Sequence, residues 1–213
     1  MRTYSLVLIC TLLAACFSPT RGIVTSSTVV AGGVPVVVAG PAGFCIDERT
    51  GEQNRAGAFV ILSDCGQTEA GRATIADVPL SAVLVAAVSP SGLLGARERG
   101  MGGALGDLEA FLRSPVGLPS LGKGRVPGAV SIIRSHRSAD ALYILVQDLA
   151  APTGAGLSQR YWRAFTEVNG RLASLSANSM ANADASEAQA RALAEGFVAA
   201  MQAANAASAR QAS

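Results

Sequence analysis

Two cysteines are the residues of this 213-residue chain whose type and spacing most plainly allow chemistry. Cys45 and Cys65 enclose a polar, turn-rich segment (47–57) and an apolar run (58–62) that predicts a strand. In an oxidising compartment they would form a disulfide, and closing a loop of about 20 residues stabilises a fold by roughly 3 kcal/mol. Two buried free thiols are the alternative. A zinc site is disfavoured because no second pair of soft ligands stands nearby.

Candidates for nucleophilic or acid–base chemistry are few. His136 is the only histidine, and its position between two arginines in a predicted turn favours a solvated loop. Ser120 lies in the segment 117–122 (GLPSLG), which only partly resembles the Gly-x-Ser-x-Gly elbow of serine hydrolases, because its first glycine comes one residue too early. We therefore expect no catalytic residue. A small periplasmic hydrolase or transferase that uses Ser120, His136 or a carboxylate pair stays open as an alternative.

The sequence also contains no convincing metal site or phosphate-binding loop. The segment 100–106 has the glycine density of a phosphate-binding loop, but it does not follow the first strand of a β-α-β unit and lacks the lysine of a P-loop. The acidic residues near the cysteines, Asp47, Glu48, Glu52 and Asp64, lack the Asp-x-Asp-x-Asp order of a calcium loop. We therefore expect no metal site and no cofactor.

Charge is sparse, at 15% of the residues, and the net charge of +2 gives no electrostatic footprint for nucleic acid. One local excess of basic residues lies between positions 97 and 137: Arg97, Arg99, Arg113, Lys123, Arg125, Arg134 and Arg137. If their loops converge, they form a binding surface for anionic lipid headgroups or an acidic protein. If not, they are scattered solvated side chains. Tyr161, Trp162 and Phe165 are a second candidate binding face, with Trp162 expected in the core.

The N-terminus has the charged, apolar and small-residue order of a secretory signal, and its apolar run is too short for a membrane-spanning helix, which needs about 20 residues. The tetrapeptide LAAC that ends at Cys16 resembles the lipobox of bacterial lipoproteins. This resemblance implies that the signal peptide, residues 1–15, is removed and that Cys16 is lipidated. Because Phe17 follows in place of an aspartate, it also implies attachment to the outer membrane, facing the periplasm. A soluble periplasmic or secreted protein is the alternative.

The rest of the chain predicts strands, turns and two helices after a polar tether at 16–27. We expect strands at 28–30, 34–38, 59–64, 82–88, 129–134, 141–147, 161–168 and 171–177. A short helix is predicted at 108–113, and a long one runs from the capping box of Ser186 and Gln189 to about residue 204.

The clearest local signal is Asn169-Gly170, the dipeptide of a two-residue type I′ hairpin. Its register pairs Val168 with Arg171 and places alternate residues on opposite faces. One face, expected to point to the core, collects Trp162, Ala164, Val168, Ala173 and Leu175. The other face, expected to be partly solvated or covered by a loop, collects Tyr161, Arg163, Phe165 and Glu167.

Together these elements predict one α+β domain at 28–205, with a largely antiparallel sheet, one short helix mid-chain, a long C-terminal helix packed across the sheet and a frayed tail at 206–213. The element order resembles the α/β/α sandwich of the PsbP and Mog1 type. The sequence favours a non-catalytic envelope lipoprotein that acts as an accessory or binding module, held to the membrane by its lipid, with an envelope protein or anionic lipid as partner. A purely structural envelope protein is a further alternative.

Overall fold

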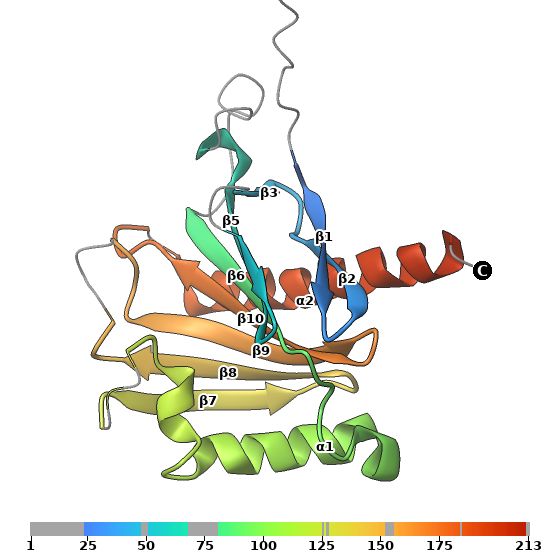
Figure 1. Cartoon of the computed structure of the whole chain (residues 1–213). Coiled ribbons are helices and arrows are strands. Elements are labelled where there is room, and N and C mark those ends of the chain that lie inside the picture. Colours follow the sequence, from blue (N-terminus) through green and yellow to red (C-terminus); the bar gives the residue numbers. More distant parts are fainter. Residues whose placement is uncertain are drawn as a thin grey trace, which may run out of the picture.

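The computed structural model describes residues 24–47, 51–67, 81–124, 126, 128–151, 156–183 and 185–211 (Figure 1). The signal peptide 1–15, the lipidation candidate Cys16 and Arg125 lie outside the described residues. The two hydrophobic cores of the described part are built from residues between Val29 and Met201. The domain therefore contains its own cores without the leader and the first part of the tether.

An antiparallel sheet of eight strands dominates the fold, which confirms the predicted α+β class. Its order is β3-β5-β6-β10-β9-β8-β7, with β4 paired to β5. The strands are β3 (Phe44–Ile46), β4 (Glu52–Asn54), β5 (Gly57–Asp64), β6 (Ala82–Val88), β7 (Val130–Arg137), β8 (Ala141–Asp148), β9 (Arg160–Val168) and β10 (Arg171–Ser179). A separate two-stranded hairpin is formed by β1 (Ser26–Ala31) and β2 (Val34–Ala39).

The β9–β10 hairpin forms as its sequence predicts. Asn169 and Gly170 make the turn with φ values of 50° and 69°, the left-handed backbone that a type I′ turn needs at both positions. Val168 pairs with Arg171, and Thr166 with Ala173. A turn set by two adjacent residues thus fixes which side chains of both strands face the core.

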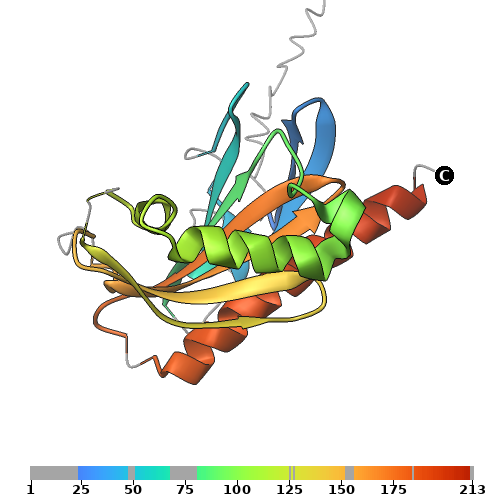
Figure 2. The ribbon, with the colours of Figure 1, turned by 90° about the horizontal axis from the view of Figure 1, so that it is seen from below.

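One face of the sheet, here called the closed face, is covered by α2 (Glu187–Gln211) and by the β1–β2 hairpin (Figures 1 and 2). The five side chains predicted to point to the core are all buried there: Trp162, Ala164, Val168, Ala173 and Leu175. The predicted capping box begins α2, because Gln189 donates its backbone N–H to Ser186 Oγ (3.2 Å) and accepts the Ser186 N–H (2.9 Å). The long helix packed across the sheet is therefore confirmed.

The other α-helix is longer than predicted. α1 (Ala96–Arg113) begins well before residue 108, the predicted start, and contains the glycine-rich segment 100–106, which lies outside the predicted helix. Gly100 has φ 71° and kinks the helix, and Leu105 and Leu112 are buried against β8 and η2 (Leu118–Leu121). Packing of this leucine face outweighs the low helix propensity of the glycines.

Two further segments differ from the predictions. His136 lies in β7 and not in a turn; its ring stacks on Tyr143 of β8, and the turn comes at residues 138–140. At the C-terminus α2 continues to Gln211, so residues 206–211 are helical and not a frayed tail. The Asn205 side chain explains this, because it accepts the Val37 N–H (2.9 Å) and donates to the Val37 carbonyl (2.8 Å). These two hydrogen bonds fix the last turns of α2 to β2.

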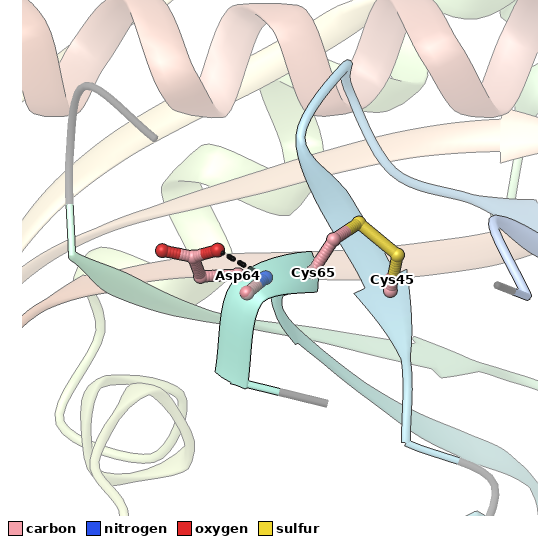
Figure 3. Close-up of a disulfide and its surroundings, with 4 residues drawn as sticks. Cys45, Asp64 and Cys65 are labelled. Carbon is pink, nitrogen blue, oxygen red and sulfur yellow. Dashed lines mark hydrogen bonds between the residues drawn. A yellow bond between two sulfur atoms is a disulfide. The ribbon is translucent and has the colours of Figure 1, made fainter. Parts of the chain in front are cut away.

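The structure contains the expected disulfide between Cys45 and Cys65 (Figure 3). Cys45 lies in β3, and Cys65 begins the short 3-10 helix η1 (Cys65–Gln67) directly after β5. β3 pairs with β5 through only three residues, so the covalent bond holds a short edge strand in place. Beside it, Asp64 Oδ1 accepts the Gly66 N–H at 2.7 Å.

Candidate functional site

The second face of the sheet is covered over only part of its width. α1 and η2 pack over β7, β8 and β9 (Figure 2), and this packing reaches β10 at Leu172, whereas among the described residues the cluster around α1 includes none of β5 or β6. The part of the face on β5, β6 and the rest of β10, here called the open half, has two depressions of about 530 and 320 Å³ that share Phe59 in their walls. Together they are called the cleft below. Their volumes lie in the range of small-molecule sites.

Strand register places three rows of side chains on this side of the sheet. Directly paired residues of neighbouring strands share a face of the sheet. The rows are Ile61, Val85, Ser176 and Arg163; Ser63, Val83 and Asn178; and Phe59, Ala87, Ser174 and Phe165. The members of these rows that line the cleft, here called its floor, are apolar on β5 and β6 and polar on β10, with one cation, Arg163, on β9: Phe59, Ile61, Val83, Val85 and Ala87, then Ser174, Ser176 and Asn178.

Arg163 is the cation of this floor. Its Nε donates to Ser176 Oγ (3.0 Å) and its Nη1 donates to the carbonyl of Ser120 on η2 (3.2 Å). Both partners are neutral, and no ion pair joins this guanidinium to a carboxylate of the described residues. Burial lowers the pKa of Arg163, although the group stays protonated at neutral pH. A partly buried positive charge therefore faces the cleft without a carboxylate in ion-pair contact among the described residues, although the charge of Asp148 acts on it from a distance.

Lys123 adds a second cation at the rim. It is an exposed residue, yet its Nζ lies 4.7 Å from the centroid of the Tyr161 ring, and the Arg163 guanidinium carbon lies 5.7 Å from the same ring. Burial of the ammonium and the nearby charge of Arg163 lower the pKa of Lys123, whereas Asp148 raises it. Desolvation raises the pKa of Tyr161 to about 12, and its hydroxyl donates to the Leu121 carbonyl at 2.5 Å.

Asp148 is the carboxylate whose charge raises the pKa of both Lys123 and Arg163, but its two oxygens already accept hydrogen bonds from backbone N–H groups. Its side chain is fully buried. Oδ2 accepts the Lys123 N–H (2.7 Å) and Oδ1 accepts the Ala150 N–H (3.0 Å). One carboxylate thus holds the loop after η2 and offsets one of two positive charges. The site retains a local excess of one positive charge, which favours an anion.

Asn178 supplies a buried acceptor without a hydrogen-bond partner among the described residues. The residue is 2% exposed, and its Nδ2 donates to the Val83 carbonyl at 3.2 Å. Its Oδ1 is buried without a hydrogen-bond partner in the described part of the chain. A buried acceptor left unpaired costs about 1–3 kcal/mol, so this oxygen requires a donor that the described residues do not provide.

Five of the seven basic residues singled out in the sequence lie on α1 and β7: Arg97, Arg99, Arg113, Arg134 and Arg137. Arg97 and Arg113 lie towards opposite ends of α1, and Lys123 lies at the cleft. Four arginines contact carboxylates: Arg99 with Asp107, Arg113 and Arg137 with Glu109, and Arg134 with Glu187. Arg137 also donates to the Gly102 carbonyl, where Gly106 leaves room for its guanidinium. Among the described members, only Lys123 contributes to the cleft.

The two candidates for hydrolase chemistry lie on opposite faces of the sheet. Ser120 contacts Arg163 on the open side and donates its hydroxyl to the Gly117 carbonyl at 2.6 Å. His136 lies on the closed side, 5.7 Å from Trp162 and 3.4 Å from Glu195 of α2. These two side chains cannot act on one substrate, which rules out that version of the hydrolase alternative.

The described residues contain no group of three or more side chains arranged to hold a metal ion. Their helices include none long and apolar enough to cross a membrane.

Sequence reasoning placed Arg163 on the non-core face but missed its role. The signal was present in the alternation of β10, where Ser174, Ser176 and Asn178 alternate with apolar residues. Two neighbouring strands with polar side chains on one shared face indicate a surface that is not simply packed. The contribution of η2 and Lys123 had no local signal, because they reach the cleft from about 40 residues earlier in the chain.

Compared with models of protein families, with curated proteins and with solved structures, the chain matches none. The cleft and the N-terminal motif are therefore the two features that bear on function.

Proposed function

We propose that this chain is a lipid-anchored, non-catalytic binding module of the bacterial envelope that holds its ligand in the cleft. The observation that carries the proposal is Arg163, a cation in the cleft floor whose hydrogen-bond partners in the protein are neutral. A sheet face with only a structural task gains stability from apolar side chains, because a desolvated charge without an anion is costly. Retaining the charge on the open half is what a binding site requires.

The anchor part of the proposal rests on the tetrapeptide LAAC that ends at Cys16 and on the disulfide. Disulfides persist in oxidising compartments such as the periplasm, which agrees with an exported protein. A lipid on Cys16 would fix the domain to the outer membrane on the periplasmic side through the tether that follows it. From there the module would act as an accessory to another envelope component.

Binding is favoured over catalysis by what the cleft offers. Ser120 uses its hydroxyl within its own turn, and the cleft presents guanidinium, ammonium and amide groups on an apolar floor. These groups recognise an anion and orient it; they do not form a nucleophile–base pair. The proposed role is therefore capture and presentation of a ligand.

Native mass spectrometry tests the binding part. The chain from Phe17 onward, exported to a bacterial periplasm without its lipid, is purified without detergent, and any retained small molecule is weighed and extracted. We expect a retained species in the wild type that is absent from Arg163→Gln and present in Arg160→Gln. Arg160 is a matched control because it lies on β9, outside the cleft, and donates to Gln147 at 2.7 Å. A bare wild-type mass from several growth conditions would contradict the proposal.

Intact-mass analysis of the full chain from membranes tests the anchor part. We expect a mass that starts at Cys16 and includes acyl chains, with two thiols that react with an alkylating agent only after reduction. A mass without acyl chains would remove the lipid anchor and leave the binding proposal to stand on the cleft alone.

A further inference from the structure

We infer that the ligand of the cleft is an amphipathic small-molecule anion: a carboxylate or phosphate group at Arg163, a hydroxyl or amide N–H at Asn178, and an apolar chain over β5 and β6. This inference rests on the proposed binding function and names the class of ligand. Three observations carry it, and each concerns a different part of the molecule that would bind.

The acidic head is indicated by the charges around Arg163. The guanidinium donates from Nε and Nη1 to two neutral oxygens, Ser176 Oγ and the Ser120 carbonyl. Its planar group has further N–H donors that can bind an anion. Lys123 brings a second positive charge to the same ring of Tyr161. Asp148 cannot take the place of the anion, because it is fully buried and both of its oxygens accept backbone N–H groups. A carboxylate or phosphate oxygen completes the set with a charge-assisted hydrogen bond.

The donor is indicated by Asn178. Its Oδ1 is buried, unpartnered among the described residues and part of the cleft wall. The amide cannot simply be reversed, because Nδ2 already donates to the Val83 carbonyl. Asn178 follows Ser176, the partner of Arg163, by two residues on the same face, which places these two residues of β10 about 7 Å apart along the strand. A hydroxyl or amide N–H a few bonds from the acidic group spans that separation.

The apolar chain is indicated by the rest of the floor. From Arg163 the row continues through Ser176 to Val85 and Ile61. Phe59, 39% exposed, borders this depression and the second one, which extends between β5, β6 and β10 towards Gly57 and Ser89. An apolar surface that runs away from a cation fits a molecule with one charged end.

The test uses defined probes on the chain from Phe17 onward, whose described part contains its own cores. Calorimetric titration compares hexanoate, octanoate, decanoate, decanol, 3-hydroxydecanoate and dodecyl phosphate. We expect affinity to rise several-fold with each pair of added methylenes, decanol to bind at least tenfold more weakly than decanoate, and 3-hydroxydecanoate to bind more tightly than decanoate. Asn178→Ala should remove the advantage of the hydroxyl and leave decanoate binding within about threefold.

Arg163→Met should weaken decanoate binding about 10- to 100-fold, the loss expected for a hydrogen bond to a charged group, whereas Arg160→Gln should leave it unchanged. If Arg163→Met does not fold, the shift of the Arg163 Nε–H resonance in the wild type on adding decanoate decides in its place. Equal binding of decanol and decanoate, or of decanoate to both arginine variants, would overturn the inference.

The outcomes also separate this inference from the proposed function. A ligand retained in the native mass measurement, together with no binding of decanoate, 3-hydroxydecanoate or dodecyl phosphate, would leave the cleft as a binding site and show that its ligand is not an amphipathic anion. No retained ligand and no probe binding would remove both.

Discussion

Neighbouring residues of β9 face two different environments. Trp162 is fully buried beneath α2 on the closed face, whereas Arg163, one residue later, lies on the floor of the cleft. β10 shows the same contrast, since Ala173, Leu175 and Ala177 face α2 while Ser174, Ser176 and Asn178 face the open half. The closed face is built for stability. The open half keeps polar and charged groups where apolar ones would stabilise the fold more, which is the difference that the proposed binding function requires.

The largest effect should come from the closed face. Trp162→Ala removes a fully buried indole, and the free energy of unfolding should fall by about 3–5 kcal/mol. Phe59→Ala, on the open half, should cost about 1 kcal/mol or less because its ring is 39% exposed. Urea denaturation followed by circular dichroism measures both. Similar losses for the two variants would mean that the two regions do not differ as described.

The disulfide should have the next largest effect. Replacing Cys45 and Cys65 together by serine should lower the free energy of unfolding by about 3 kcal/mol, because the unfolded chain gains the entropy of an open 20-residue loop. The same loss should appear when the wild type is unfolded in the presence of a reductant. The double variant should show no further loss with reductant, and a wild type that is insensitive to reductant would contradict the prediction.

A smaller effect is expected where α1 joins β7. Glu109 accepts from Ser135 (2.5 Å) and contacts Arg113 and Arg137, each at 3.3 Å. The hydrogen bond from Ser135 and the two arginines lower the pKa of Glu109, against the effect of its burial. A carboxyl group whose pKa is lowered by folding stabilises the fold above its unfolded pKa, and this contribution disappears as the pH falls.

Glu109→Gln should therefore cost about 1 kcal/mol at pH 7. The difference from the wild type should be full above about pH 5 and shrink as the pH falls below the ordinary glutamate value of about 4.3. Denaturation curves at several pH values measure it, with Glu98→Gln on the same helix as the control. A difference that does not change between pH 7 and pH 3 would show that the charge of Glu109 is not the cause.

The smallest effect on stability should come from Arg163. Arg163→Met loses two hydrogen bonds but also removes a desolvated charge, so the free energy of unfolding should change by about 1 kcal/mol or less, in either direction. A loss of about 3 kcal/mol or more would show that Arg163 mainly stabilises the fold, and its charge would no longer support a ligand site in the cleft.

The closed face was largely predictable from the sequence, because its signals are local. Asn169-Gly170 sets the hairpin register, and Ser186 with Gln189 begins α2. α1 was predicted only in part, since its glycine-rich first turns are held by tertiary packing and by Arg137 from a distant strand. His136 was misplaced because a polar stretch next to a turn cannot be told from the end of a strand that packs on an aromatic ring.

The cleft shows the same division between local and distant signals. Alternation along β9 and β10 puts Arg163 and Asn178 on one face, and this can be deduced from the sequence. Which part of that face stays open depends on where α1 and η2 lie. That placement follows from contacts across the fold, such as the hydrogen bond from Tyr161 to Leu121.

One NMR titration compares the two regions most directly. The chain from Phe17 onward, labelled with ¹⁵N, reports the closed face through the indole N–H of Trp162, the only tryptophan, and the cleft through the Nε–H of Arg163. Adding decanoate should shift the Arg163 signal saturably and leave the Trp162 signal in place. A saturable shift of Trp162 with an unchanged Arg163 would contradict the account, because the ligand would then enter the closed face and not the cleft.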